Sequence, residues 1–366
     1  MTDSHWMLRA LDLARSVLGT TSPNPSVGAV IVRDGQFVAE GCTQPVGQAH
    51  AEVVAIQAAQ EMKRSLDGCT MYVTLEPCCH QGLTAPCTRS ILDAGISRVV
   101  IGTVDPYISV RGGGIRKLRE HGVQVDVGLE QEQCLRMIRG FHRACLHGLP
   151  EVTCKAAISL DGRISTAAGQ SQWITGTEAR KFGHQLRAMH DAILVGIGTV
   201  LEDNPKLTCR VPGGKDPVPV VLDTHLRIPA DSALLHGNQR AIIICGEDAA
   251  ERSLNAEIVR LPVENDRVPL VLALGTLVDR NIHRVLVEGG GVVHRSMVET
   301  RLVDTLALFV ASTVIPGGRP WLAGSDLEDL NDAPRFGPPV IRQLGNDVLL
   351  QYELVHQHPM TAVEEE

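Results

Sequence analysis

Four residues in the first half of the chain have the types and the spacing of a catalytic metal site. His50 and Glu52 are two positions apart, Cys78 follows Pro77, and Cys87 comes after eight further residues. One imidazole and two thiolates suit Zn²⁺, and three protein ligands leave the fourth tetrahedral position open to water, as in catalytic zinc sites. Glu52 is not a ligand in this arrangement. Its carboxylate can carry a proton from that water to a ring nitrogen and then to a departing amine.

The elements expected around these residues place them at helix starts. The alanine-rich segment 50–60 is predicted to be a helix, a strand over 70–75 leads into Cys78, and a second helix over 88–94 follows Cys87. The positive end of a helix dipole lowers the pKa of a thiol and favours the thiolate that binds metal. Taken singly, each piece also has an ordinary explanation, a surface helix or a buried thiol at a strand end. Their order along the chain favours zinc.

Strands and helices alternate along the first part of the chain, which predicts a three-layer α/β domain. The expected helices are 5–18, 50–60, 88–94, 112–121 and 130–147, and the expected strands are 27–32, 36–41, 70–75, 98–102 and 123–127. Gly148, Leu149 and Pro150 then interrupt the pattern. We therefore expect one domain over 1–147 and a second α/β domain over 148–366. Strands of the second domain are expected at 152–158, 192–195, 218–222, 241–245, 285–287 and 305–309.

The second half contains one segment that suggests chemistry. The strand expected at 285–287 ends in Glu288 and three glycines, and a helix is expected to begin near Val292. Backbone amides and the helix dipole at such a turn favour a bound phosphate. A triple glycine can also be no more than a tight connection between strand and helix. This half has no G-x-G-x-x-G turn, so a Rossmann dinucleotide site is not supported.

Length and composition exclude several classes of protein. A chain of 366 residues exceeds what one hydrophobic core organises, which agrees with two domains. A net charge of −8 and only 3% aromatic residues oppose a nucleic-acid partner. No apolar stretch reaches the roughly 20 residues that cross a bilayer. Ten scattered cysteines and the lack of a secretory signal pattern lead us to expect a cytoplasmic protein.

The metal motif also carries a family resemblance. His-x-Glu followed by Pro-Cys and a second Cys is similar to the zinc-dependent nucleobase deaminases. Cytidine and transfer-RNA adenosine deaminases have two residues between the cysteines, whereas the loop here is longer. That loop, 75–87, together with 23–28 and 50–53, closely resembles the bacterial bifunctional riboflavin-biosynthesis deaminase/reductase. The resemblance covers nearly the whole chain, and in the second half it is carried by segments 155–163, 169–175, 186–188, 198–205, 207–210 and 288–291.

The resemblance implies a fold and a pair of reactions. It implies a cytidine-deaminase-like domain with one zinc ion, followed by a dihydrofolate-reductase-like domain that uses NADPH. The first would deaminate 2,5-diamino-6-ribosylamino-4(3H)-pyrimidinone 5′-phosphate. The second would reduce the ribosyl side chain to give 5-amino-6-ribitylamino-uracil 5′-phosphate. The partners implied are this small phosphorylated pyrimidine and further copies of the chain, as a dimer or tetramer, with no nucleic acid and no membrane.

The same resemblance assigns residues in the second domain. Those implied to face the cofactor are Ala157, Trp173, Thr199, Asp203, Gly290, Gly291, Val292, Val293, His294 and Arg295. Those implied to face the substrate are Ser171, Arg187, Leu207, Arg210 and Glu288. Arg187 and Arg210 are of a type that can fork onto a 5′-phosphate, and Trp173 can supply a flat wall. Lys155 and Asp161 are expected beside the hydride path without an assigned role.

Three residues depart from the family pattern, and two alternative functions stay open. Cys79, Leu83 and Ala85 stand where relatives usually have Ser, Arg and Pro, and Leu83 lacks a charge that could steer a phosphate. One alternative is a nucleoside or transfer-RNA deaminase with a non-catalytic second domain, which the acidity and the long loop oppose. The other is a metabolite-binding protein built on a degenerate enzyme. The intact Glu52 and the complete ligand set oppose it.

Overall fold

The computed structural model describes residues 1–82, 84–324 and 328–354, and the chain divides after Gly148 into two compact units. Leu83 and the end of the expected domain 148–366 lie outside the described residues. None of the helices in the described ranges has both the length and the apolar character of a membrane span.

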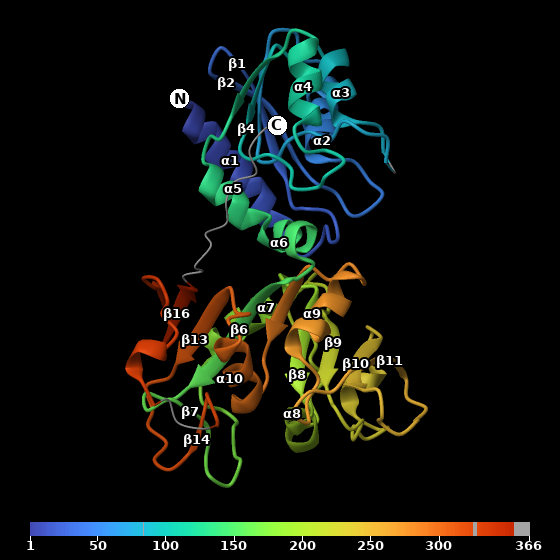
Figure 1. Cartoon of the computed structure of the whole chain (residues 1–366). Coiled ribbons are helices and arrows are strands. Elements are labelled where there is room, and N and C mark those ends of the chain that lie inside the picture. The colour runs from blue at the N-terminus through green and yellow to red at the C-terminus, as the bar shows by residue number, and fades with distance from the viewer. Residues whose placement is uncertain (83, 325–327, 355–366) are drawn as a thin grey trace. The chain divides into compact units, whose positions relative to one another are not determined.

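The first unit is a three-layer α/β structure built on a five-stranded sheet. Its elements are α1 (Asp3–Ser16), β1 (Gly28–Arg33), β2 (Gln36–Cys42), α2 (Ala51–Glu61), β3 (Thr70–Val73), α3 (Cys87–Asp93), β4 (Arg98–Ile101), α4 (Gly113–Glu120), β5 (Gln124–Val127), α5 (Gln131–Met137) and α6 (Arg139–His147). The strand order is β2-β1-β3-β4-β5, with β1 antiparallel to both neighbours and β3, β4 and β5 parallel. Figure 1 shows α1 and α5 on one side of this sheet and α2, α3 and α4 on the other.

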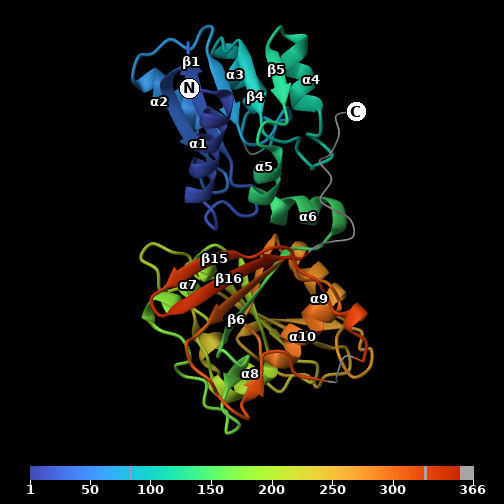
Figure 2. The same ribbon diagram turned by 90° about the vertical axis from the view of Figure 1, so that its left-hand side faces the viewer.

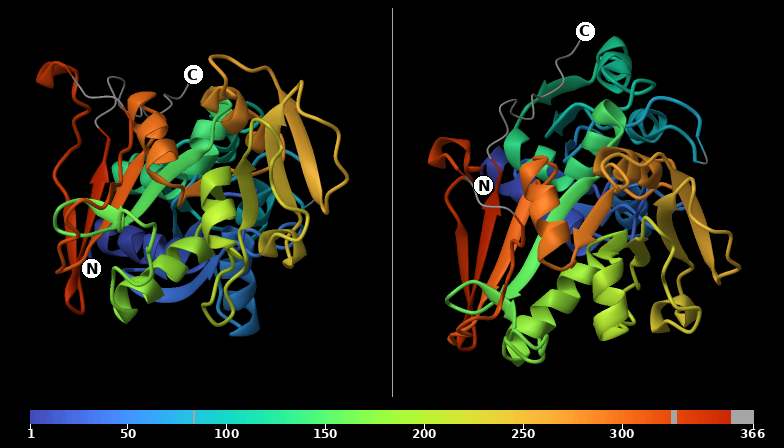
Figure 3. Two further views of the ribbon diagram at one scale, coloured as in Figure 1. Left: turned by 90° about the horizontal axis from the view of Figure 1, so that it is seen from below. Right: turned by 60° about the horizontal axis from the view of Figure 1, so that its bottom comes forward.

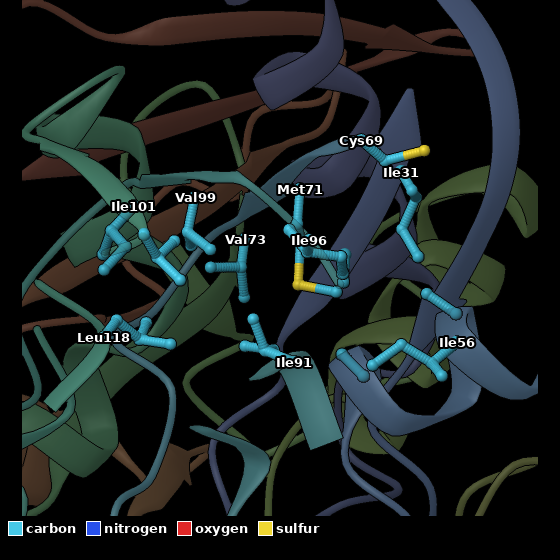
Figure 4. Packing of buried hydrophobic residues seen from close by; sticks show 14 of the residues in the cluster. Ile31, Ile56, Cys69, Met71, Val73, Ile91, Ile96, Val99, Ile101 and Leu118 are labelled. Atoms are coloured by element: carbon cyan, nitrogen blue, oxygen red, sulfur yellow. The ribbon is translucent and has the colours of Figure 1, made fainter. Parts of the chain in front are cut away.

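Alternating side chains of the strands build a core on each face of this sheet. Ile31, Met71 and Val73 pack with buried residues of α2, α3 and α4, as Figure 4 shows. Val30 and Tyr72, one position along in each strand, pack against α1 and α5 instead. Because side chains of a strand point alternately to its two faces, β1 and β3 each support both helical layers. The metal-site motif is carried by the layer of α2 and α3.

One expected helix of the first unit is wrong. The segment 130–147 is predicted as a single helix, but α5 and α6 are separate elements that meet at Ile138. The backbone of Ile138 is not helical, with φ −102° and ψ 13°. The bend directs the buried Ile138 side chain into the core beneath α2 and α3, whereas Cys134 of α5 packs on the α1 side. Helical periodicity in the sequence does not reveal such a change of direction.

The second unit contains a nine-stranded mixed sheet. Its elements are β6 (Glu151–Ile158), β7 (Arg163–Ser165), α7 (Thr177–Ala188), β8 (Ala192–Gly196), α8 (Ile197–Asp203), β9 (Val218–Leu222), β10 (Ala241–Gly246), β11 (Ala256–Leu261), α9 (Leu270–Val278), β12 (Arg284–Val287), α10 (Gly291–Glu299), β13 (Thr305–Val310), β14 (Arg319–Pro320), β15 (Val340–Leu344) and β16 (Asp347–Glu353). The strand order in the nine-stranded sheet is β11-β10-β9-β8-β12-β6-β13-β16-β15, and β7 and β14 pair in a separate two-stranded sheet. In Figure 2, α7 lies on one side of β6 and α9 and α10 lie on the other.

The parallel strands of this sheet determine where a site can form. In the spatial order, the seven strands β11, β10, β9, β8, β12, β6 and β13 run parallel to one another. The next strand, β16, is antiparallel to β13, and β15 is antiparallel to β16. Figure 3 shows the antiparallel pair (red) and the β10–β11 pair (yellow) at opposite edges. The carboxyl ends of β6, β8 and β12 are therefore neighbours in the middle of the sheet, which is where open α/β sheets bind ligands.

The expected strands of the second unit are all present, but the structure also contains strands and a helix that the sequence analysis does not predict. The hairpin of β15 and β16 has an exposed first strand, from Val340 to Gln343, so apolar and polar positions do not separate into two faces. Its turn, Gly345-Asn346, is a two-residue hairpin signal that the prediction does not use. The strand β11 and the helix α9 are also absent from the prediction.

Buried His190 makes the stability of the second unit depend on pH. Its Nδ1 lies 2.6 Å from the Leu186 carbonyl and its Nε2 lies 3.0 Å from Thr153 Oγ1. Burial, aided by the charge of Arg284, lowers the pKa of His190 from 6.5 to about 4. Between these two pH values the unfolded chain binds a proton that the folded chain does not, so stability falls as the pH falls. We expect a loss of about 3 kcal/mol over this range.

Urea unfolding from pH 7 to pH 4 measures this dependence. His190→Asn removes the titrating group and should give a shallower slope of unfolding free energy against pH. The matched control is His236→Asn, at an exposed position of the same unit, and it should keep the parental slope. Equal slopes for the parental protein and His190→Asn would contradict the prediction.

Candidate active sites

The metal-site residues predicted from sequence lie together in the first unit. His50 is the residue directly before α2, and its ring Nδ1 lies 3.6 Å from Cys78 Sγ and 3.3 Å from Cys87 Sγ. The three ligand atoms all lie within 4.8 Å of one another. Cys87 begins α3, and its backbone N–H donates to Cys78 Sγ at 3.3 Å. Donor type and spacing both fit a zinc ion held by one nitrogen and two sulfurs.

The charges around this site favour a thiolate and a carboxyl group poised for proton transfer. Hydrogen bonding from the Cys87 thiol, with a further contribution from His50, lowers the pKa of Cys78 although burial opposes it. Glu52 is on the first turn of α2 and only 4% exposed. Burial, followed by the negative charge of Cys78, raises the pKa of the Glu52 carboxyl to about 7. A carboxyl group with that pKa can both accept and donate a proton near neutrality.

Asp105 is a buried carboxyl group near this site that the sequence prediction does not include. It follows β4 in the Val104-Asp105-Pro106 segment and is 7% exposed. Burial raises its pKa to about 7, the Tyr107 backbone N–H opposes the shift, and Cys78 and Glu52 add to it. The signal available in the sequence is its place in the short segment between the expected strand 98–102 and Pro106. Cys79, which departs from the family pattern, has Sγ 4.0 Å from the Ser109 carbonyl.

In the second unit, three charged residues meet at the carboxyl end of β12. Glu288 follows β12 directly and accepts from Arg187 of α7 through both carboxylate oxygens, at 2.8 and 3.1 Å. Lys155 of β6 places Nζ 3.5 Å from Glu288 Oε2. Arg187 also donates to the Thr208 carbonyl at 2.8 Å. The three side chains are 12–19% exposed, so this is a largely buried charge cluster.

This cluster engages part of the Arg187 guanidinium. Arg187 is predicted to face the substrate, as a residue type that can fork onto a 5′-phosphate, and in the structure its Nε and Nη2 donate to Glu288. Burial would raise the pKa of the Glu288 carboxyl, yet the charges and hydrogen bonds of Lys155 and Arg187 hold it well below its ordinary value. Glu288 is therefore an ionised carboxylate under all ordinary conditions. A contact of Arg187 with the substrate stays a prediction.

The glycine turn after β12 leads into a helix start, as the sequence predicts. Its helix, α10, begins at Gly291, and α8 begins just after the neighbouring strand β8. A Cβ atom added at Gly290 would meet only Thr199 Oγ1, at 3.7 Å, so the backbone there is open. Thr199 and Gly290, both predicted to face the cofactor, thus lie together between two helix N-termini. The amides and dipoles at this position fit the phosphates of a dinucleotide.

The remaining predicted residues of this unit lie in different surroundings. Trp173 is 66% exposed, and the guanidinium of Arg180 stacks 4.6 Å from its ring centroid. Asp203, Arg210 and Val292 are exposed, whereas Ala157, Ser171 and Arg295 are partly buried. Leu207 is buried, and its neighbour Thr208 supplies the carbonyl that Arg187 contacts. Sequence reasoning does not predict the stacking of Arg180 on Trp173.

Two residues of the predicted cofactor turn have side chains directed into the protein. His294 is 2% exposed and its Nε2 lies 3.4 Å from the Val287 carbonyl, so its ring belongs to the core. Val293 packs against Gly196 and Gly289, where an added Cβ would come within 2.8 Å of its side chain. A contact of His294 with the cofactor is therefore limited to its backbone, whereas Val293 is only partly buried. Asp161 accepts hydrogen bonds from Ser159 and Ile315 and so ties a loop together.

Comparison with known proteins matches both units. Residues 1–103 match the family model described as the cytidine and deoxycytidylate deaminase zinc-binding region, and residues 150–350 match the RibD C-terminal domain. The chain is 40% identical to riboflavin biosynthesis protein RibD of Bacillus amyloliquefaciens, covering 95% of each chain. It is 37% identical to RibD of Actinobacillus pleuropneumoniae over 97% of this chain and 96% of that protein. The chain belongs to the RibD family.

Solved RibD structures share the fold of the whole chain. One from Thermotoga maritima, described as a diaminohydroxyphosphoribosylaminopyrimidine deaminase/5-amino-6-(5-phosphoribosylamino)uracil reductase, superposes with a TM-score of 0.88 at 35% identity, covering 96% of this chain and 98% of that one. RibD of Acinetobacter baumannii gives a TM-score of 0.87 at 33% identity, covering 97% and 99%. As a RibD protein, the chain is a bifunctional deaminase and reductase of riboflavin biosynthesis with a zinc-binding deaminase region. The predicted fold class and enzyme class are confirmed.

Proposed function

We propose that residues 1–147 deaminate 2,5-diamino-6-ribosylamino-4(3H)-pyrimidinone 5′-phosphate with one zinc ion. We further propose that residues 148–366 use NADPH to reduce the ribosyl group of the product, which gives 5-amino-6-ribitylamino-uracil 5′-phosphate. The observation that carries the proposal is the group of His50, Cys78 and Cys87 with Glu52 buried beside it. Membership of the RibD family supports the choice of substrate.

In the deaminase unit, His50, Cys78 and Cys87 would hold the metal. When bound, a zinc ion lowers the pKa of a water molecule and so supplies a nucleophile at neutral pH. Glu52 accepts the proton of the attacking water at a carboxylate oxygen. It then delivers that proton to the adjacent ring nitrogen. In a second transfer it takes the proton of the new hydroxyl group and gives it to the amino group, which leaves as ammonia as the C–N bond breaks and the carbonyl forms. The buried position of Glu52 keeps bulk water from competing for the proton.

In the reductase unit, the turn at Gly290 and the start of α8 would hold the cofactor phosphates. When bound, NADPH supplies a hydride, here to C1′ of the ring-opened ribosyl group. Glu288 orients Arg187 and Lys155. Arg187 keeps hydrogens on Nη1 and Nη2 that do not bind Glu288 or Thr208, and these face the substrate. The exposed Arg210 is the further cation proposed for the 5′-phosphate. Trp173 supplies a flat wall.

The main alternative is a nucleoside or transfer-RNA deaminase with a non-catalytic second domain. The match of residues 150–350 to the RibD C-terminal domain and the open backbone at Gly290 both oppose it. We also propose a cytoplasmic location, on the basis of the cysteine content, and a homo-oligomer, dimer or tetramer, on the basis of the family resemblance. Size-exclusion chromatography with light scattering measures the oligomeric state.

Two measurements on the purified full-length chain test the proposed function. Metal analysis should find about one zinc per chain, as a single site with three protein ligands requires. The protein should release ammonia from the diaminopyrimidine substrate without a cofactor, and it should oxidise NADPH only when the deaminated product is present. Ammonia release by zinc-free protein would refute the metal site. NADPH oxidation no faster than in buffer would refute the reductase assignment.

A further inference from the structure

Glu76 is a buried acidic residue that the proposed mechanism does not use. It lies between β3 and Cys78, and it is 3% exposed. Its two carboxylate oxygens accept four backbone N–H groups. Oε1 accepts from Gly114 at 2.9 Å and Ile115 at 3.2 Å, and Oε2 accepts from Gly112 at 3.0 Å and Asp105 at 3.1 Å. A carboxylate offers about four acceptor positions, so its hydrogen-bonding capacity is filled.

The four donors come from two elements that flank the metal-site loop. Asp105 is in the loop after β4, and the other three residues form the start of α4. The first N–H groups of a helix have no hydrogen-bond acceptor within the helix, and they lie at its positive end. Glu76 supplies these groups with acceptors and places a negative charge beside the positive end. Gly112 adopts φ +68°, and a Cβ at Gly114 would lie 2.1 Å from the Pro77 carbonyl. The loop and the helix start are packed with no room for a side chain between them.

The same loop is fixed on its other side by α3. The Thr88 N–H donates to the Cys78 carbonyl at 3.2 Å, and the Cys87 N–H donates to Cys78 Sγ. The Pro77-Cys78 segment is thus held by Glu76 against α4 and by Cys78 against α3. We propose that Glu76 is a positioning residue of the metal site, because it anchors the backbone that places Cys78 opposite His50 and Cys87. This inference rests on the proposed zinc site.

Glu76→Gln tests the inference with little change of shape. The amide nitrogen would face N–H donors in place of an oxygen, so two of the four hydrogen bonds are lost. Loss of a group that orients a metal ligand typically lowers metal affinity about 10–100-fold, and we expect that loss here. Competition with a chromogenic zinc chelator measures it. The absorption spectrum of the Co²⁺-substituted protein should also change, because it reports the arrangement of the thiolates around the metal.

Two controls separate positioning from general destabilisation. Val30→Ala removes buried apolar volume on the opposite face of the same sheet, so it should lower the melting temperature and leave zinc affinity unchanged. Reduction of the deaminated product by the second unit should keep its parental rate in both variants. If Glu76→Gln does not fold, Glu76→Asp, which keeps the charge but shortens the reach, takes its place.

The outcomes distinguish this inference from the proposed function. Parental zinc affinity and a parental Co²⁺ spectrum in the folded Glu76 variant would overturn the positioning role. The positioning role would also be overturned if the Glu76 variant and Val30→Ala had equal melting temperatures and the Glu76 variant lost no more zinc affinity than Val30→Ala. Absence of zinc from the parental protein would instead overturn the proposed metal site.

Discussion

Glu52→Gln is expected to lower the rate of deamination about 10²–10⁴-fold, the usual contribution of a positioned general acid–base. Glutamine keeps the size of the side chain but cannot accept and return a proton. The loss should appear in kcat, because Glu52 acts on the reacting atoms and is not among the three ligand atoms that would hold the metal. Ammonia release under saturating substrate measures the effect.

The same chain supplies the controls for this variant. Zinc content and NADPH-dependent reduction of the deaminated product should both match the parental protein, since Glu52 lies in the first unit. Glu61→Gln, an exposed position at the other end of α2, should keep full deamination. A Glu52→Gln protein that releases ammonia at the parental rate would remove Glu52 from the mechanism. Loss of zinc in that variant would assign it a metal-binding role instead.

The metal site is the part of the protein that the sequence predicts best. Its residues come in a fixed order at two helix starts and one strand end, and local sequence patterns describe such positions well. The structure accordingly brings His50, Cys78 and Cys87 together and buries Glu52 beside them. The role of Glu76 is not predictable in this way. Its four hydrogen-bond partners lie 29 to 39 positions further along the chain, in a loop and a helix start that only the folded sheet brings near.

The second unit is less predictable because its site depends on contacts between distant segments. Arg187 and Glu288 are 101 positions apart, and nothing in either local sequence shows that they form an ion pair. The side chain of His294 points into the core, which a helical pattern beginning at three glycines does not reveal. The glycine turn itself is predictable, since an open backbone at a helix start is a local property. The strand pattern succeeds for the buried parallel strands and fails for the exposed edge strand β15.

Glu288→Gln is the substitution with the largest expected effect on the second unit. It leaves Lys155 and Arg187 largely buried without their shared carboxylate, and breaking a buried ion pair from one side costs about 3–5 kcal/mol. The free energy of unfolding of the second unit should fall by about that amount. Reduction of the deaminated product should be lost as well, because Arg187 and Lys155 lose the group that orients them. Urea unfolding and NADPH oxidation measure the two effects, and ammonia release should stay at the parental rate.

A double variant separates the stability effect from the functional one. Two cations and one carboxylate give the cluster a net charge of +1, Glu288→Gln raises it to +2, and adding Lys155→Met returns it to +1. The double variant should therefore regain part of the lost stability and none of the reductase activity. Glu178→Gln, in an exposed pair with Lys181 on α7, is the matched control and should cost only about 0.3–0.5 kcal/mol. If Glu288→Gln is no less stable than this control, the cluster does not contribute to stability. Parental reduction by Glu288→Gln would show that Glu288 does not orient the substrate-facing cations.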